Sequence, residues 1–572
     1  MPVSEVKPFA QTDAFQKRLR SRRRADSRFK YYGVFAIGVA LCLLLVLLIS
    51  IGLEARTAFT RHTLSVSLSQ QDMVSGDPYA GVRSDLLAVA GNPQDRTERL
   101  LVGQLVSPLA VSQMTSTETA AGVHKTRLPI SDDADLYLKG VSSETRKWQL
   151  PVQRAGDGTL TGDFSEAVRT LGLWRQEELE RFRRVRLRSA EREVSLLANQ
   201  LQALPEDDFL KRRAEAASAR LSNLQSQLEQ MEAEISERQI RTTQSDPSVL
   251  IRTGEVYGQV TKISGDRISY DVVLEGLTEQ AQTQLLVVRK PVGMRAISDV
   301  QIMVIEELKA RGQIGWQLNT RLLSQTDSSE AELAGLLAGL LGSVFLMVTT
   351  MLIAVPVGIA AAIYLEEFAP RNTFTNFVQV NINNLAAVPS IVFGLLGAAI
   401  LVNGVVIPLP FVDQALTLGG GLGRGWPLVG GIVLALMTLP TIIISSRAAL
   451  SSVPNSIRQG ALAVGASRLQ MIHHHVLPIA GPGILTGSII GLAQALGETA
   501  PLLLIGMVAF LGDMPTGVTD RATALPVLIF QWSTRAERAW EPLTSVAIII
   551  LLALMLCLNG LAVWLRMRFD KR

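Results

Sequence analysis

Three groups of residues in this 572-residue chain have types and spacing that could do chemistry. The first is Glu498, the only charged residue in the five long apolar blocks of the C-terminal part. An ionisable group inside an apolar segment is costly and is a functional-site candidate by default. The second is His473-His474-His475, but consecutive helical residues point about 100° apart and cannot converge on one metal ion. The third is the glycine-rich run 419–425, which predicts a flexible connector or, as the alternative, an anion-binding nest.

The chain lacks the residues of a nucleotide-hydrolysing enzyme. No lysine directly follows a glycine, so the phosphate-binding loop G-x-x-x-x-G-K-[ST] is missing. His62 and His124 are isolated and are expected at the surface. The two cysteines, Cys42 and Cys557, both lie in apolar blocks, which excludes a disulfide-stabilised soluble domain. We therefore expect no catalytic residue, no cofactor and no metal site.

The elements that must position Glu498 are membrane spans. The chain is 48% hydrophobic and only 19% charged, against about 25% charged in ordinary soluble domains. The uncharged run 31–53 exceeds the roughly 20 residues that cross a bilayer, and is too long for the apolar region of a cleaved signal peptide. Five further blocks bring the prediction to a six-span helical membrane protein: Leu333–Ile363, Leu385–Phe411, Trp426–Ile444, Gly483–Leu511 and Leu543–Leu565.

Charge bias sets the predicted orientation. The segment 1–30 and the tail 566–572 are basic, and the loop 447–482 carries three arginines and no acid. Because basic loops stay in the cytoplasm, both termini are predicted to be cytoplasmic and the hydrophilic insert 54–332 extracytoplasmic. A basic run is also typical of a nucleic-acid-binding tail. Its position directly beside a span favours the membrane interpretation, so we expect no nucleic-acid partner.

The insert is predicted to be a mixed α+β domain with an antiparallel coiled-coil hairpin at about 174–240. Apolar residues recur at spacings of three and four on both sides of the turn Pro205–Asp208, as in a heptad seam. A rigid spacer is the expected role, with a docking arm as the alternative. A β hairpin is predicted at about 256–275. The seam comprises Leu187, Ala190, Val194, Leu197, Leu201 and Leu204, then Leu210, Ala214, Ala217, Leu221, Leu224, Leu228, Met231 and Ile235.

Three sequence strings in the apolar C-terminal domain 333–565 are specific enough to suggest a family. A cytoplasmic loop runs from Arg458-Gln459-Gly460-Ala461 through Gly465 to His475-Val476-Leu477-Pro478. One span contains Gly497-Glu498-Thr499-Ala500-Pro501-Leu502-Leu503, and an earlier block contains Val388-Pro389-Ser390-Ile391-Val392-Phe393-Gly394-Leu395.

Over about 330–570 the sequence resembles the PstA-type permease subunit of bacterial phosphate ABC importers. The loop has the spacing of the importer signature E-A-A-x-x-x-G-x(9)-I-x-L-P, and G-E-T-A-P-L-L is similar to the phosphate branch. Gln459, Gly460 and His475 depart from the signature, and Gln494 stands where that branch often has arginine. The insert resembles the long N-terminal extension of one branch of the family.

The resemblance implies the type I ABC importer permease fold in a bacterial inner membrane. It also implies a second homologous permease, two cytoplasmic ATPase subunits that hydrolyse ATP, and an extracytoplasmic phosphate-binding protein. The loop is then the ATPase-coupling site, a short helix held by a turn at Gly465 and stopped near Pro478. Its residues are Gln459, Gly460, Ala461, Gly465, Leu469, Ile472, Val476, Leu477 and Pro478, with Leu469, Ile472 and Val476 as its apolar side.

Glu498, Thr499 and Gln494 are predicted to lie on the translocation pathway or at the interface with the second permease, and Pro501 is predicted to kink this span. For Glu498, a protonated side chain hydrogen-bonded between helices is the alternative. For the whole chain, the alternatives are a permease for another oxyanion, such as sulfate or molybdate, and an envelope signalling or tethering protein built around the coiled hairpin.

Overall fold

A computed structural model of the chain divides into two compact units. The membrane unit comprises Met1–Thr60 and Asn319–Arg572, and the insert unit comprises Arg61–Leu318. The structure describes residues 13–69, 77–113, 119–120, 123–155, 158–203, 205–236, 239–241, 246–264, 266–277, 279–408, 415–507 and 513–570.

The boundary of the insert differs from the predicted range 54–332. Residues 319–332 belong to the membrane unit, where Leu322 is buried in one cluster with Trp532 and Trp540. The carboxylate of Asp327 accepts a hydrogen bond from Nε1 of Trp532 at 3.0 Å, and burial raises the pKa of Asp327. A polar segment can therefore be part of the membrane unit, because its polar groups are paired there.

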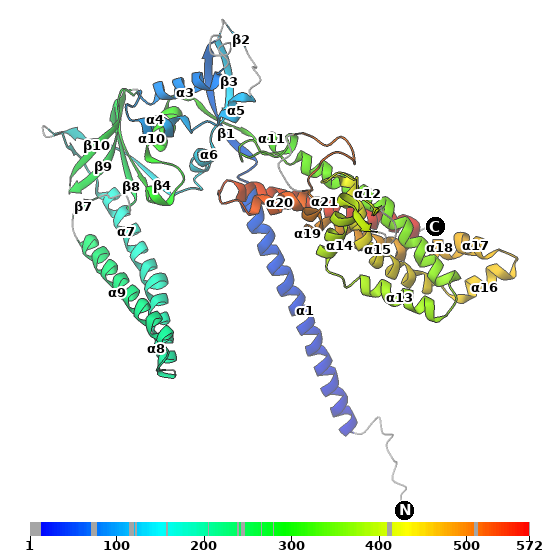
Figure 1. Cartoon of the computed structure of the whole chain (residues 1–572). Coiled ribbons are helices and arrows are strands. Elements are labelled where there is room, and N and C mark those ends of the chain that lie inside the picture. Colours follow the sequence, from blue (N-terminus) through cyan, green and yellow to red (C-terminus); the bar gives the residue numbers. More distant parts are fainter. Residues whose placement is uncertain are drawn as a thin grey trace, which may run out of the picture. The chain divides into compact units, whose positions relative to one another are not determined.

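Long apolar helices form the membrane unit (Figure 1). In the described part of the chain, five helices are long and apolar enough to cross a membrane. A bent pair of helices adds a sixth if the pair counts as one span. The spans are predominantly apolar because a bilayer offers no water to polar side chains. The elements are α1 (Asp13–Ala55), α11 (Arg321–Ser324), α12 (Leu337–Ile363), the π-turn η4 (Tyr364–Phe368), α15 (Pro427–Ser451), α18 (Leu477–Gly497), α20 (Leu525–Ser533) and α21 (Trp540–Asp570).

Small residues let these helices approach closely. A Cβ on Gly431 of α15 would lie 2.5 Å from the Thr349 side chain of α12, and a Cβ on Gly487 of α18 would lie 1.9 Å from Oγ of Ser445. Membrane helices lack a strong hydrophobic drive to associate, so close backbone packing of this kind contributes much of their stability.

The prediction of one continuous span over 385–411 is wrong for its described part. The chain instead forms α13 (Thr373–Leu385), then α14 (Ser390–Leu396) continued by the π-helix η5 (Gly397–Asn403), bent by 102° between them. Pro389 explains the break, since a proline disfavours helical geometry in the residue before it and lacks an N–H. A short hairpin follows, β13 (Val405–Pro408) and β14 (Ala415–Leu418); Phe411 lies outside the described residues.

The insert unit is α+β. Among its described strands, one sheet has the order β12-β1-β3-β2 and another the order β4-β11-β8-β9-β10-β6-β5, with β7 beside β9. The strands are β1 (Thr60–Ser69), β2 (Thr119–Ala120), β3 (Val123–Pro129), β4 (Thr145–Leu150), β5 (Gln153–Arg154), β6 (Leu160–Thr161), β7 (Gln239–Arg241), β8 (Ser248–Gly254), β9 (Val256–Ser264), β10 (Arg267–Leu274), β11 (Gln280–Val288) and β12 (Ile314–Leu318).

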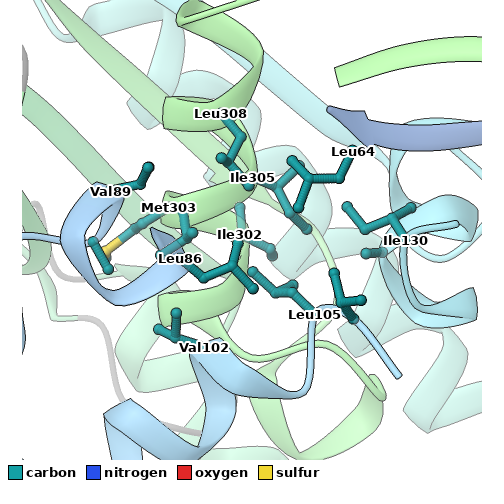
Figure 2. Close-up of a cluster of buried hydrophobic side chains, with 14 of the residues drawn as sticks. Leu64, Leu86, Val89, Val102, Leu105, Ile130, Ile302, Met303, Ile305 and Leu308 are labelled. Carbon is teal, nitrogen blue, oxygen red and sulfur yellow. The ribbon is translucent and has the colours of Figure 1, made fainter. Parts of the chain in front are cut away.

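Helices cover the first sheet and close the main core of the insert. Figure 2 shows this core, in which Ile302 and Ile305 of one helix meet Leu86 of another and Ile130, which follows β3. The helices are α3 (Pro78–Val89), α4 (Arg96–Gly103), α5 (Pro108–Ser112), α6 (Asp132–Leu138) and α10 (Asp299–Ala310). His62 lies beside α6 and contacts the Asp135 carboxylate through Nδ1 at 2.8 Å; the side chain of His124 is outside the described residues.

Two long arms make up the helical hairpin. The first arm runs through α7 (Ser165–Arg181), the π-helix η2 (Phe182–Leu187) and α8 (Arg188–Ala203), and it starts nine residues before the predicted 174. The second arm is α9 (Asp208–Ser236), which lies beside α8 (Figure 1). The seam residues that the structure describes are buried or half-buried, while Leu204 and the side chain of Ile235 lie outside the described part.

A buried ion pair ties α10 to β8. The Arg252 guanidinium pairs with the Glu307 carboxylate, and both side chains are at most 1% exposed. Glu307 also accepts a hydrogen bond from Nε of Arg311 at 2.7 Å. Glu307→Ala is therefore expected to destabilise the insert unit by about 3–5 kcal/mol, because it leaves a buried charge without its partner.

Protease resistance of the insert in the full chain, measured against temperature, checks this prediction. Glu144→Ala serves as the control, since the exposed pair of Glu144 with Arg289 should contribute less than about 1 kcal/mol. An equal loss of protease resistance in Glu307→Ala and Glu144→Ala would contradict the role assigned to the buried pair.

Candidate coupling and translocation sites

The predicted coupling loop folds as two helices joined by a tight turn. The first, α16 (Asn455–Ala463), ends just before Gly465, which has φ +89° and so adopts a conformation that favours glycine. The N–H of Ala466 donates to the Ala461 carbonyl at 3.2 Å and closes the turn. The second helix, α17 (Arg468–Met471), starts at a capping box between Ser467 and Gln470.

The predicted apolar side of this loop is divided between the core and solvent. Ala461, Ile472 and Val476 are buried in one cluster, whereas Leu469 is 71% exposed. Val464, next to the turn, is 85% exposed. The expectation that Leu469, Ile472 and Val476 form one apolar face is therefore wrong. All three lie on one helix, but only Ile472 and Val476 face the buried cluster. Gln459, Gly460, Gly465 and Pro478 are also exposed, and Leu477 is half-buried.

Pro478 does not stop the second helix, contrary to the prediction. The helix runs unbroken from Arg468 to Gly497 through the π-turn η6 (Ile472–Val476) and α18. Within an α-helix, a proline lacks the N–H and clashes with the carbonyl four residues earlier. Here the N–H of Leu477 donates to the Ile472 carbonyl, five residues earlier, and this wider turn accommodates Pro478.

Two ion pairs hold the coupling region, and the sequence analysis missed them. The Arg447 guanidinium, near the end of α15, lies 3.3 Å from the Glu366 carboxylate, and that of Arg458 in α16 lies 2.9 Å from Glu367. Arg458 also donates to the Leu450 carbonyl at 2.7 Å. The sequence feature that could have indicated these pairs is Glu366-Glu367, which lies just beyond the apolar block that ends at Ile363. These contacts connect α16 to the π-turn η4 at the end of α12 and to α15. They therefore hold the exposed turn at Gly465 against the membrane helices.

Glu498 lies between two helices rather than inside one. α18 ends at Gly497, Glu498 is extended with φ −79° and ψ 120°, and α19 (Ala500–Leu504) starts two residues later. Pro501 does not kink a continuous span as predicted. It occupies the first turn of α19, where its missing N–H costs little.

The side chains near Glu498 are accessible in the single chain. Glu498 and Thr499 are half-buried and Gln494 is exposed. Among the residues that the structure describes, none forms a hydrogen bond or ion pair with the Glu498 carboxylate. The Glu498 carboxylate is therefore accessible from outside the single chain.

The two strings that flank this region pack against each other. A Cβ on Gly394 of α14 would lie 2.6 Å from Cα of Pro501 in α19, and Phe393 and Leu502 share one buried cluster. The break at Pro389 and the break at Glu498 therefore belong to one packed arrangement.

Gly394→Val is expected to destabilise this packing by about 1–3 kcal/mol, since the added side chain meets backbone and forces a shift. Thermal stability of the purified protein in detergent measures the effect. A matched control is Gly481→Val in α18, where a Cβ would meet nothing within 4 Å. A change no larger than that of the control would refute the close contact.

Backbone hydrogen bonds hold part of the glycine-rich run 419–425, for which a flexible connector or an anion-binding nest was predicted. The N–H of Gly420 donates to the Ile400 carbonyl at 2.8 Å, and that of Gly425 donates to the Ile505 carbonyl at 3.1 Å. These amides are engaged within the membrane unit, which disfavours both a flexible connector and an anion-binding nest. His473–His475 are exposed on η6, and the described residues contain no cluster of three or more side chains suited to a metal.

Comparison with known proteins identifies the family. Residues 354–571 match the model described as a binding-protein-dependent transport system inner membrane component. The phosphate transport system permease protein PstA of Haemophilus influenzae is 30% identical over 42% of this chain and 79% of its own length. PstA of Yersinia pestis is 31% identical over 40% of this chain and 71% of its own. The chain belongs to the PstA-type family of ABC importer permeases.

Three further matches cover parts of the permease, and the first of them agrees with the family. The probable ABC transporter permease YqgH of Bacillus subtilis is 34% identical over 38% of the permease and 67% of its own length. Residues 16–147 of the permease match a model described only as a domain of unknown function (DUF3333). The inward-facing MetNI methionine ABC transporter aligns with a TM-score of only 0.31 at 15% identity, over 41% of the permease and 95% of that chain. The permease is a transport subunit and not an enzyme.

Proposed function

We propose that this permease imports inorganic phosphate across the inner membrane by ATP-driven alternating access. The observation that carries the proposal is the match with two phosphate permeases over most of their length. The string Gly497–Leu503, which resembles the phosphate branch, supports it further.

The assembly that we propose contains a second, homologous permease, two ATPases at the cytoplasmic face and a phosphate-binding protein outside. Both termini and the α16–α17 turn are then cytoplasmic, and the insert unit is extracytoplasmic. The exposed apolar residues of the turn, Val464 and Leu469, suit a groove on the ATPase. The Arg458–Glu367 pair supports the turn from behind, so that movement of the ATPase reaches α12 and α15.

Glu498 takes an indirect part in transport in this proposal. An ionised carboxylate repels an anionic substrate and does not bind it directly. A basic group of the second permease would balance its charge, and Gln494, one turn earlier, can donate a hydrogen bond. Thr499 would donate its hydroxyl to the substrate or back to the preceding turn.

Uptake competition tests the substrate. In cells that lack their other phosphate importers, this assembly should restore uptake of radiolabelled phosphate, and excess sulfate or molybdate should not reduce it. Competition by sulfate or molybdate would favour the alternative of another oxyanion. Purification of the chain without any ATPase would favour the envelope tether instead.

The insert unit is predicted to be dispensable for transport itself. The N–H of Asn319 donates to the Phe59 carbonyl at 2.8 Å, so the two ends of the insert are adjacent in the chain fold. A short flexible linker in place of Arg61–Leu318 should therefore close without strain and leave measurable phosphate uptake. Complete loss of uptake, with the spans shown to be inserted, would mean that the insert gates transport or recruits a partner.

A further inference from the structure

An exposed apolar strand end marks the last residues of the insert unit. Residues alternate faces along a strand, so Ile314, Trp316 and Leu318 of β12 share one face. Ile314 packs against the main core of the insert, but Trp316 and Leu318 are 71% and 65% exposed. The core thus covers only the beginning of this apolar face.

The strand is also an edge strand with no charged residue. β12 is the outermost strand of its sheet, and its sequence is Ile-Gly-Trp-Gln-Leu. Exposed edge strands are normally protected by charges, prolines or a covering element, because they otherwise pair with other chains. None of the five residues of β12 provides a charge or a proline, so we expect something outside the chain to cover it.

Chain connection places this strand end beside the bilayer. Asn319 follows Leu318 directly, and its Nδ2 donates to the Ala58 carbonyl at 3.1 Å. Ala58 is three residues beyond Ala55, where the first span ends. Trp316 is three residues from Asn319 and so lies within about 10 Å of it. The headgroup layer on each side of a bilayer is about 5–8 Å thick. A side chain at Trp316 can therefore reach this layer from the end of the first span.

The chemistry of the exposed residues fits that layer. Tryptophan is enriched at membrane interfaces, because its ring is apolar while its N–H needs a polar partner. The segments of the membrane unit that adjoin the two ends of the insert in sequence also expose apolar residues, Phe59 at 42% and Leu323 at 57%. A lipid surface would cover these residues and β12 alike.

We propose that Trp316 and Leu318 insert into the headgroup layer at the end of the first span, so that β12 is a lipid-binding edge of the insert unit. This contact covers the apolar edge and fixes the attachment end of the insert at the membrane surface. The proposal requires only that α1 crosses the membrane, and it does not depend on the transported substrate.

Nitroxide labels at single cysteines test the proposal in the full chain. The two native cysteines, Cys42 and Cys557, are replaced by serine, and labels are placed at positions 316, 317 and 318 in turn. The protein is reconstituted in vesicles of phosphatidylethanolamine and phosphatidylglycerol. Collision rates of each label with oxygen, which concentrates in lipid, and with a water-soluble nickel chelate are then compared.

The expected result is an alternating pattern. The ratio of oxygen to nickel collisions should be several-fold higher at 316 and 318 than at 317, whose side chain lies on the opposite face. The Leu318→Cys variant retains Trp316, so it tests the face even if loss of the tryptophan disturbs the fold. Equal, water-like ratios at all three positions would overturn the proposal. Labels at 316 and 318 that neither reagent reaches would also overturn it, since they would indicate a protein contact instead of lipid.

Discussion

Leu469→Glu is expected to leave the permease in the membrane but to reduce phosphate uptake, and stimulation of ATP hydrolysis, at least about tenfold. Leu469 is 71% exposed on α17, beside the turn at Gly465 and the exposed Val464. A hot-spot residue near the centre of an interface contributes about 2 kcal/mol or more, and about 1.4 kcal/mol already corresponds to a tenfold change in affinity. A carboxylate at this position would be buried without a partner against the ATPase.

The matched control is Phe209→Glu, in the hairpin of the insert unit. Phe209 is 67% exposed, so the same change is made at a similar exposure away from the coupling turn. The control should retain wild-type uptake. Gly465→Glu should also uncouple transport, because it adds charge and places a side chain at φ +89°. Normal uptake and normal ATPase stimulation in the Leu469 variant would contradict the docking assignment.

Glu498→Gln is expected to insert normally and to lower phosphate uptake at least about tenfold. The change preserves shape and removes the charge, so it isolates the electrostatic role of a carboxylate at the break between α18 and α19. Facing lipid, such a group would cost about 2.5–3.5 kcal/mol on insertion scales. The break instead leaves it half-buried, with no partner among the described residues of its own chain.

Glu541→Gln is the control for this substitution and should transport normally, since the Glu541 side chain is exposed in the first turn of α21. Wild-type uptake by Glu498→Gln would reduce Glu498 to a structural hydrogen-bonding residue. Labelling of Glu498→Cys by a lipid-soluble but not by a water-soluble thiol reagent would contradict a position on the pathway or at the permease interface.

Patterns that depend on period and length were predictable from the sequence. The first span, the helices α12, α15 and α21 and the turn of the helical hairpin lie where apolar length and heptad spacing placed them. β9 and β10 pair over residues 257–274, within the predicted hairpin at about 256–275. These features depend on how apolar residues repeat along a short stretch of the chain. The sequence of that stretch is therefore sufficient to predict them.

Features that depend on tertiary packing were not predictable in the same way. Proline has opposite outcomes at two positions: it accompanies a 102° bend at Pro389 but is accommodated by a π-turn at Pro478. Pro501 opens a new helix after Glu498. Whether a proline breaks, bends or begins a helix depends on what packs around it, such as the contact between Gly394 and Pro501.

The charged contacts of the coupling region show the same limit. Arg458 is part of the predicted coupling loop, and Glu367 lies 91 residues before it in sequence. Their pairing appears only once α16 folds back onto the end of α12. Similarly, Ile472 is buried and Leu469 is exposed although both lie on one helix. Ile472 packs in a cluster with Leu450 and Ala461 from other helices, and the sequence of its own helix does not indicate these neighbours.

ATP-driven uptake by the reconstituted assembly tests the central claim most directly. This chain, the second permease, the ATPase and the binding protein are placed in vesicles, and radiolabelled phosphate or sulfate is followed with and without ATP on the ATPase side. We predict accumulation of phosphate that requires ATP, this chain and the binding protein, and no accumulation of sulfate. Absence of ATP-dependent phosphate accumulation in an intact assembly, or equal accumulation of sulfate, would contradict the account.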